Sequence, residues 1–87
     1  FLKTMVDSWN RGDPAPIEAV VGAVRHQSPY AYRLLFTDRN AAWAKWIGTR
    51  LEQPGTVFVA VGTGHLVGED SVQAKLARAG IPSARVN

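Results

Sequence analysis

A six-residue run from Thr56 to Val61 constrains the fold of this chain more than any other feature. The run reads Thr-Val-Phe-Val-Ala-Val, so it is apolar and β-branched and does not alternate between polar and apolar positions. Such a run predicts a strand covered on both faces, which is the usual state of a parallel strand in an α/β layered fold. The segment from Ala84 to Val86 is the predicted parallel partner, reached by a right-handed crossover.

Apolar residues at helical spacing predict that most of the remaining chain is helical. The clearest stripe is formed by Leu2, Met5, Val6 and Trp9, and similar stripes follow further along the chain. Breaker and capping residues set the expected ends: a first helix stopping at Arg11-Gly12, a second opening at Asp13-Pro14, a short third over Tyr30 to Phe36, a fourth capped by Thr37 or Asp38 and ended by Pro54-Gly55, and a fifth opened by an Asp70/Gln73 capping box and closed by Gly80.

These elements together predict an α/β chain, more narrowly an α+β fragment that is mostly helical and carries a short parallel two-strand βαβ unit. A covered strand needs neighbours on both edges, and the chain offers one clear partner. We therefore expect it to be part of a larger α/β domain whose other strands lie outside it. Alone, it is expected to form a homo-oligomer or to exchange elements, so that the open sheet edge is covered.

Length and composition exclude several classes of function. The 87 residues make at most one small domain, and the absence of cysteine excludes thiol catalysis and cysteine-based zinc sites. The net charge is +3, but the seven arginines are dispersed and no RNA- or DNA-binding motif is present, so nucleic acid is not an expected partner. The longest apolar run, Val57 to Val61, is far shorter than the roughly 20 residues of a membrane span.

The turn after the predicted strand carries the strongest candidate site. Gly62 and Gly64 are expected to adopt positive φ and to let the backbone approach a ligand, with Gly68 closing the loop. His65 offers an imidazole that ligates a metal or transfers a proton near neutral pH, and Glu69 follows closely. A mixed nitrogen and oxygen set suits zinc, manganese or cobalt.

Other interpretations of this turn stay open. Taken alone, the pattern favours a tight turn that holds a hydrogen-bonded histidine before a capped helix. One histidine is not a metal site, because a catalytic zinc needs about three protein ligands, so further ligands would lie outside the chain. The glycine spacing is one residue longer than the dinucleotide fingerprint, and no Walker motif is present.

Asp38-Arg39-Asn40 forms a second candidate region. Arg39 is a rigid donor for carboxylate or phosphate, and Asn40 can donate and accept hydrogen bonds. The alternative is a helix start with a capping aspartate and a solvated arginine. The nearby Trp43 and Trp46 are expected in the core rather than in a ligand stack.

The order of these motifs resembles the C-terminal signature of the TraB/GumN family. The resemblance rests on Arg39-Asn40-x-x-Trp43, on the run from Phe58 through Gly62-Thr63-Gly64-His65 to Gly68, on the acidic Glu69-Asp70, and on Trp9-x-x-Gly12-Asp13 upstream. It covers essentially all 87 residues. Ser71 stands where the family usually has glycine after the acidic residue.

The resemblance implies a fragment of a longer domain with half of a catalytic site. The family is similar to the Tiki metalloproteases and more distantly to erythromycin esterase-like and ChaN-like proteins, and it carries two Gly-x-x-His motifs. Gly62 to His65 matches the second motif, and the first is absent here. By this resemblance His65 is a metal ligand or general base, Arg39 and Asn40 orient substrate or polarise a carbonyl, and Glu69 is a weaker catalytic candidate.

The expected function is therefore the C-terminal part of a metal-dependent hydrolase, a peptidase by preference, using manganese, cobalt or zinc. Its substrate would be a peptide or a small molecule, and the missing N-terminal half of the domain would complete the site. The alternatives are a non-catalytic protein that binds a peptide or small ligand in the same cleft, and haem binding. The sequence does not fix the compartment, although a periplasmic, cell-surface or secreted parent fits the resemblance.

Overall fold

The computed structural model describes residues 1–86, and every regular element in that range is helical. In chain order the elements are α1 (Leu2–Asn10), α2 (Ala15–Gln27), α3 (Pro29–Tyr32), the π-helical turn η1 (Arg33–Thr37), α4 (Asp38–Arg50), the 3-10 turn η2 (Thr63–Leu66) and α5 (Val72–Arg78). None of these helices is long and apolar enough to cross a membrane.

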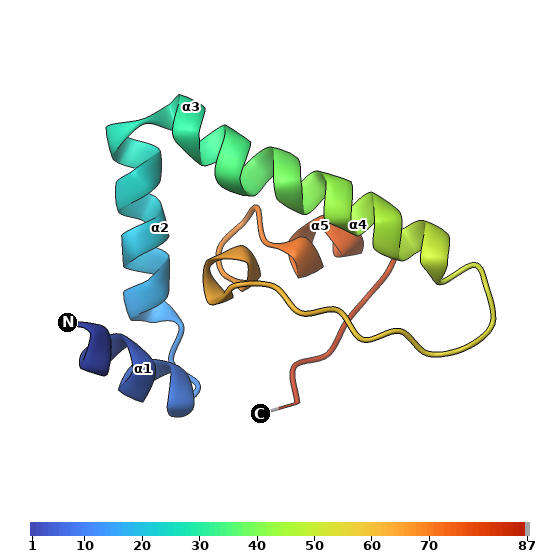
Figure 1. The fold of residues 1–87 in the computed structure, drawn as a ribbon, viewed down its shortest axis with the longest axis horizontal. Coiled ribbons are helices and arrows are strands. Elements are labelled where there is room, and N and C mark those ends of the chain that lie inside the picture. The colour runs from blue at the N-terminus through green and yellow to red at the C-terminus, as the bar shows by residue number, and fades with distance from the viewer. Residues whose placement is uncertain (87) are drawn as a thin grey trace.

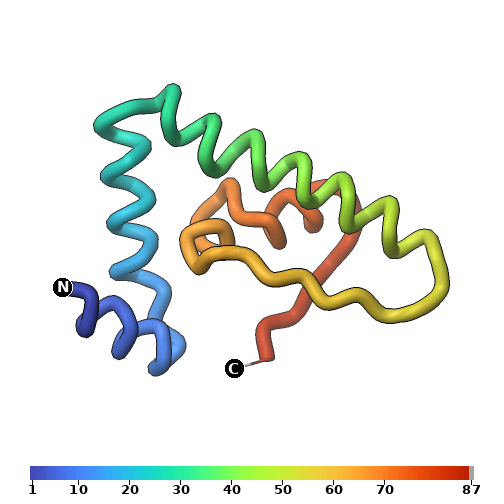
Figure 2. Tube along the Cα trace, in the orientation of Figure 1, coloured from blue at the N-terminus to red at the C-terminus, as the bar shows by residue number. Residues whose placement is uncertain are grey.

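The elements are arranged around one long helical rod. The elements α3, η1 and α4 follow one another without a break, and α2 meets this rod at an angle, with α1 at its far end (Figure 1). The turn η2 and helix α5 lie in the angle between α2 and α4, as the Cα trace also shows (Figure 2). The C-terminal segment returns towards α1, where the Arg85 guanidinium donates a 2.6 Å hydrogen bond to the Gly12 carbonyl.

Local chemistry explains why the first helices begin and end where they do. Gly12 follows α1 with a φ of +77°, a left-handed conformation that glycine adopts without strain. The Asp13 carboxylate then accepts a hydrogen bond from the Ala15 amide at the start of α2. Ser28 interrupts the chain before Pro29, and its hydroxyl accepts from the Ala31 amide to cap α3. The predicted end of the first helix and the predicted start of the second are therefore confirmed. The short third helix predicted over Tyr30 to Phe36 is wrong in its bounds, because α3 begins at Pro29 and the chain stays helical through η1 into α4.

The main core lies between α4 and α5. Ala44 and Ile47 of α4 pack against Val72 and Leu76 of α5, and all four are at least 91% buried. Burying a side chain of this size is worth roughly 1.5–3 kcal/mol relative to leaving it in water. This contact fixes α5, and with it the turn that precedes α5, against the long rod.

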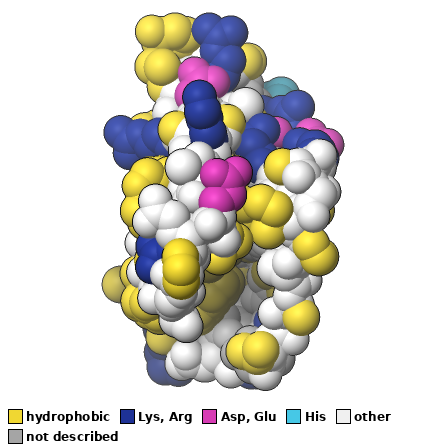
Figure 3. Space-filling view, turned by 90° about the vertical axis from the view of Figure 1, so that its right-hand side faces the viewer, with side chains coloured by type: hydrophobic (Ala, Val, Ile, Leu, Met, Phe, Trp, Pro, Cys, Tyr) yellow, Lys and Arg dark blue, Asp and Glu magenta, His cyan; other side chains and the backbone are white. Residues whose placement is uncertain are grey.

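Much apolar surface remains uncovered. The molecule measures 42 × 31 × 17 Å and its radius of gyration is 13.9 Å, against about 12 Å for a compact domain of this length. The apolar stripe of α1 is exposed, with Leu2 at 74% and Val6 at 50%. Hydrophobic side chains are also spread over the face shown in Figure 3.

The predicted α/β class and its two-strand βαβ unit are wrong. Thr56 to Val61 and Ala84 to Val86 are both extended, but neither pairs with another segment within residues 1–86. Phe58 is 91% exposed and Val86 is 96% exposed, so the run is not covered on both faces. A strand is stabilised by its neighbours in the sheet, and the second segment lies instead against the loop after α1, held by Arg85.

Two predicted helix caps are also wrong. Neither Thr37 nor Asp38 caps α4 with its side chain, because the chain is already helical through η1 at this point. At α5 the capping residue is Ser71, whose hydroxyl accepts from the Ala74 amide. Asp70 stands one residue too early, and its carboxylate is engaged elsewhere.

Candidate functional site

The turn η2 presents His65 to the long helical rod. The His65 amide donates to the Gly62 carbonyl at 3.0 Å, which closes the 3-10 turn. The imidazole then lies between two aromatic rings of the rod, with centroid distances of 5.1 Å to Phe36 and 4.7 Å to Trp43. The Trp43 contact is edge-on, a favoured geometry for aromatic pairs.

Asn40 selects the tautomer of this imidazole. Its side chain is 99% buried, and its two polar atoms each have one partner. The Nδ2 group donates to the Asp70 carbonyl at 2.8 Å, and Oδ1 lies 2.8 Å from His65 Nδ1. Because a backbone carbonyl only accepts, Nδ2 must face Asp70 and Oδ1 must face His65. The His65 proton therefore sits on Nδ1, and Nε2 keeps its lone pair.

The surroundings of His65 keep that lone pair available. Burial lowers the pKa of His65 below 6.5, and the positive charge of Arg39 lowers it further. Nε2 has no hydrogen-bond partner among residues 1–86, yet it is not one of their buried unpaired atoms, so it reaches solvent. At neutral pH the site thus offers a neutral imidazole nitrogen that can accept a proton or bind an electrophile.

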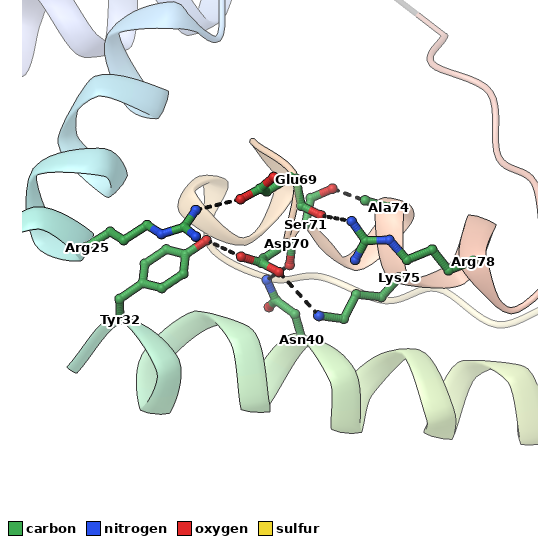
Figure 4. Close-up of polar contacts among 9 residues, drawn as sticks. All are labelled: Arg25, Tyr32, Asn40, Glu69, Asp70, Ser71, Ala74, Lys75 and Arg78. Carbon is green, nitrogen blue, oxygen red and sulfur yellow. Dashed lines mark hydrogen bonds and ion pairs between the residues drawn. The ribbon is translucent and has the colours of Figure 1, made fainter. Parts of the chain in front are cut away.

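Asp70 joins three elements on the other side of Asn40. Its carboxylate accepts a 2.6 Å hydrogen bond from the Tyr32 hydroxyl and lies 3.4 Å from Lys75 Nζ (Figure 4). The hydrogen bond from Tyr32 is the main cause that lowers the pKa of Asp70. Burial, together with the same hydrogen bond, raises the pKa of Tyr32 to about 12.

Glu69 is paired with residues of α2 and α5. Its carboxylate lies 2.6 Å from the Arg25 guanidinium, and its carbonyl accepts from Arg78 at 2.8 Å (Figure 4). The Arg25 and Glu69 side chains are 54% and 65% exposed, so solvent screens the pair and its contribution to stability is small. The structure therefore places this predicted catalytic residue in a surface ion pair.

The other predicted residues fall in two groups. Asn40 contacts His65 directly, whereas Arg39 is exposed and acts on His65 through its charge. The three loop glycines differ from one another. Positive φ was expected at Gly62 and Gly64, but Gly62 has φ −64° and only Gly68, at +80°, is left-handed. Gly64 is closely packed, because a Cβ there would lie 3.2 Å from a side-chain carbon of Phe36.

The residues present do not make a complete metal site. No group of three or more histidine, aspartate or glutamate side chains within the described range is arranged to hold an ion. Each acidic neighbour of His65 along the chain is already paired, Glu69 with Arg25 and Asp70 with Tyr32 and Lys75. This part of the chain therefore offers one imidazole nitrogen, and a metal would need further ligands from outside it.

Sequence reasoning selected Asn40 but missed two other residues of the same helical stripe, Tyr32 and Phe36. Tyr32, Phe36, Asn40 and Trp43 recur at spacings of four, four and three, and all of them contact His65 or Asp70. One polar residue within an aromatic stripe was the available signal. It was overlooked because the segment before Thr37 was treated as a separate helix.

In this chain an asparagine on a long helix orients a histidine that a glycine-rich turn presents. The sequence profile of the TraB/PrgY/gumN family matches residues 1–85. The chain belongs to this family, as the resemblance had predicted. Comparison with curated proteins gave no match, and comparison with solved structures gave none either.

Proposed function

We propose that this chain supplies the histidine-bearing part of a hydrolytic site that acts on amide or ester bonds, with peptides as the preferred substrates. The main support for this proposal is the 2.8 Å contact between His65 Nδ1 and Asn40 Oδ1, which leaves Nε2 unprotonated. Nε2 also reaches solvent. A neutral imidazole with a lowered pKa is suited to remove a proton from an attacking water at neutral pH.

The positive charge of Arg39 supports the same proposal. Its side chain is exposed, and it is close enough to lower the pKa of His65. A guanidinium beside a general base can stabilise the negative charge that develops on a carbonyl oxygen when water attacks. A manganese, cobalt or zinc ion at this site would need further ligands, because the described residues supply only one of the several that such an ion takes.

The test is hydrolysis by the full-length protein encoded by the natural gene. Fluorogenic peptide mixtures and p-nitrophenyl acetate serve as probes, and bound metal is measured in the same preparations. Removing a general base typically costs 10²–10⁴-fold in rate, so we expect a loss of roughly that size in His65→Ala. His26→Ala is the matched control, because His26 is exposed at the end of α2, and it should keep full activity. Equal activity in both variants would refute the proposal.

A non-catalytic binding protein is the second candidate, favoured by a hollow beside the site. This hollow has a volume of about 210 Å³ and is lined by apolar side chains of α4 and the extended segment, namely Trp43, Trp46, Ile47, Val59, Ala60 and Val61. Trp46 is 55% exposed, so its expected place in the core is wrong and its ring is available to a ligand. Peptide binding without turnover, retained in His65→Ala, would favour this candidate.

A further inference from the structure

We propose that Tyr32 and Asp70 act as positioning residues that select the tautomer of His65 through the side chain of Asn40. The two residues are called the Tyr32–Asp70 clamp below. The inference deepens the proposed function, because it concerns how the same imidazole is held, but the arrangement can be tested without any substrate.

An asparagine alone cannot select a histidine tautomer. Its amide can rotate by half a turn, which exchanges an acceptor oxygen for a donor nitrogen. Asn40 Oδ1 opposite His65 favours a proton on Nδ1, whereas Nδ2 in the same place would favour a proton on Nε2. Selection therefore needs a third group that only accepts, and the Asp70 carbonyl, 2.8 Å from Nδ2, is that group.

The Asp70 carbonyl is useful only if its own position is fixed. The carboxylate of the same residue is held from two directions, by the Tyr32 hydroxyl of α3 at 2.6 Å and by Lys75 of α5 at 3.4 Å (Figure 4). The next residue, Ser71, is 98% buried and caps α5. The side chain of Asp70 and the backbone that follows it thus both hold the carbonyl that accepts the hydrogen bond from Asn40.

Burial makes the clamp effective. Tyr32 is 92% buried, and the side chains of Asp70 and Lys75 are less than one-fifth exposed. Interactions in such surroundings are screened less by water than those of the exposed Arg25–Glu69 pair. The clamp also spans distant parts of the chain, since Tyr32 and Asp70 are 38 residues apart and Asn40 and His65 are 25 apart.

The test compares two tyrosines of the same rod region. Tyr32→Phe removes the hydroxyl of the clamp and keeps the ring, whereas Tyr30→Phe removes an equivalent hydroxyl from a residue that is 66% exposed. Nitrogen-15 NMR of labelled histidine at about pH 8, where an imidazole is neutral, gives the ratio of the two tautomers directly. His26 serves as an internal reference, and dispersion of the amide signals shows that each variant is folded.

We expect His65 to carry its proton on Nδ1 in the parent chain and in Tyr30→Phe. In Tyr32→Phe the ratio of the Nδ1–H form to the Nε2–H form should fall about tenfold, which is the change in an equilibrium that the loss of one hydrogen bond causes. An unchanged ratio in folded Tyr32→Phe would overturn the proposal. The tautomer ratio is measured without substrate, so its value does not depend on whether the protein hydrolyses anything. The clamp and the proposed function can therefore fail separately.

Asn40→Asp adds a test that a merely structural role of Tyr32 would not pass. An ionised aspartate presents oxygen atoms only, so it accepts from Nδ1 whichever way it is turned. In this background the additional Tyr32→Phe substitution should leave the tautomer ratio unchanged. A further fall of the ratio in the folded double variant would show that Tyr32 acts by another route and would overturn the proposal.

Discussion

Replacing Asn40 by alanine removes the residue on which the site depends. The substitution deletes the donor to the Asp70 carbonyl and the acceptor for His65 Nδ1, each at 2.8 Å. The two hydrogen bonds contribute roughly 1–3 kcal/mol net, and leaving their partners without a bond in this buried place costs roughly 1 kcal/mol more. Alanine is the better helix former and returns about 0.5 kcal/mol.

The free energy of unfolding should therefore fall by about 1.5–3.5 kcal/mol. A chain of this length has a total stability of roughly 4–13 kcal/mol, so the loss is a large fraction. Urea denaturation followed by tryptophan fluorescence measures it as a lower midpoint with an unchanged slope. Asn10→Ala is the control, because Asn10 is exposed at the end of α1, and such surface changes stay within about 0.5 kcal/mol. Equal midpoints for the two variants would refute the reasoning.

Three further predictions test the surroundings of the site. Gly64→Ala should destabilise the chain by about 1–2 kcal/mol, because the new Cβ would lie 3.2 Å from a carbon of Phe36. Gly22→Ala in α2, whose new Cβ would meet no atom within 4 Å, should stabilise the chain by about 0.5–1 kcal/mol in the same urea experiment. The opposite order of the two variants would contradict the packing argument. The pKa of Tyr32 is raised from 10.0 to about 12, so its contribution to stability is complete below pH 10 and is lost as the pH rises towards 12. An absorbance titration of the parent chain should show one phenol that ionises late, and this phenol should be missing in Tyr32→Phe. The same titration curve in both proteins, apart from one ordinary phenol, would contradict the prediction. The lowered pKa of His65 means that the unfolded chain takes up this proton first, so stability should be complete above about pH 6.5 and fall as the pH drops below it; the same fall in His65→Gln would assign it to another group.

The helices were predictable because their signals are local. Gly12 ends α1 through its own conformation, and Ser28 stops α2 and caps α3 within three residues. Such features follow from short-range geometry, and the sequence carries them in full. The stripe predicted on the fourth helix, Trp43, Trp46, Ile47 and Leu51, is right only in part, because Ile47 is buried against α5 whereas Trp46 and Leu51 are more than half exposed.

The strands were not predictable because a strand depends on its neighbours. Thr56 to Val61 has the residues of a covered strand, yet residues 1–86 hold no segment that pairs with it. Phe58 is consequently exposed. The expectation that a homo-oligomer or an exchanged element covers this segment stays a prediction, and so does the larger domain.

The site was predictable in its residues but not in its contacts. The motif pattern selected His65 and Asn40, whose side chains the fold brings to 2.8 Å from one another. It did not select Tyr32, because no local rule joins a tyrosine to an aspartate 38 residues away. Asp70 was assigned to a helix cap, and its actual partners became visible only when three helices were placed together.

The central claim is that Asn40 selects the tautomer of the neutral His65 imidazole that leaves the lone pair on Nε2. The most direct measurement is the nitrogen-15 spectrum of the unmodified chain, labelled at histidine, slightly above neutral pH. The account predicts a proton on Nδ1 and a lone pair on Nε2 for His65. A spectrum showing the proton on Nε2 would contradict it, because the nitrogen proposed to accept a proton would already carry one.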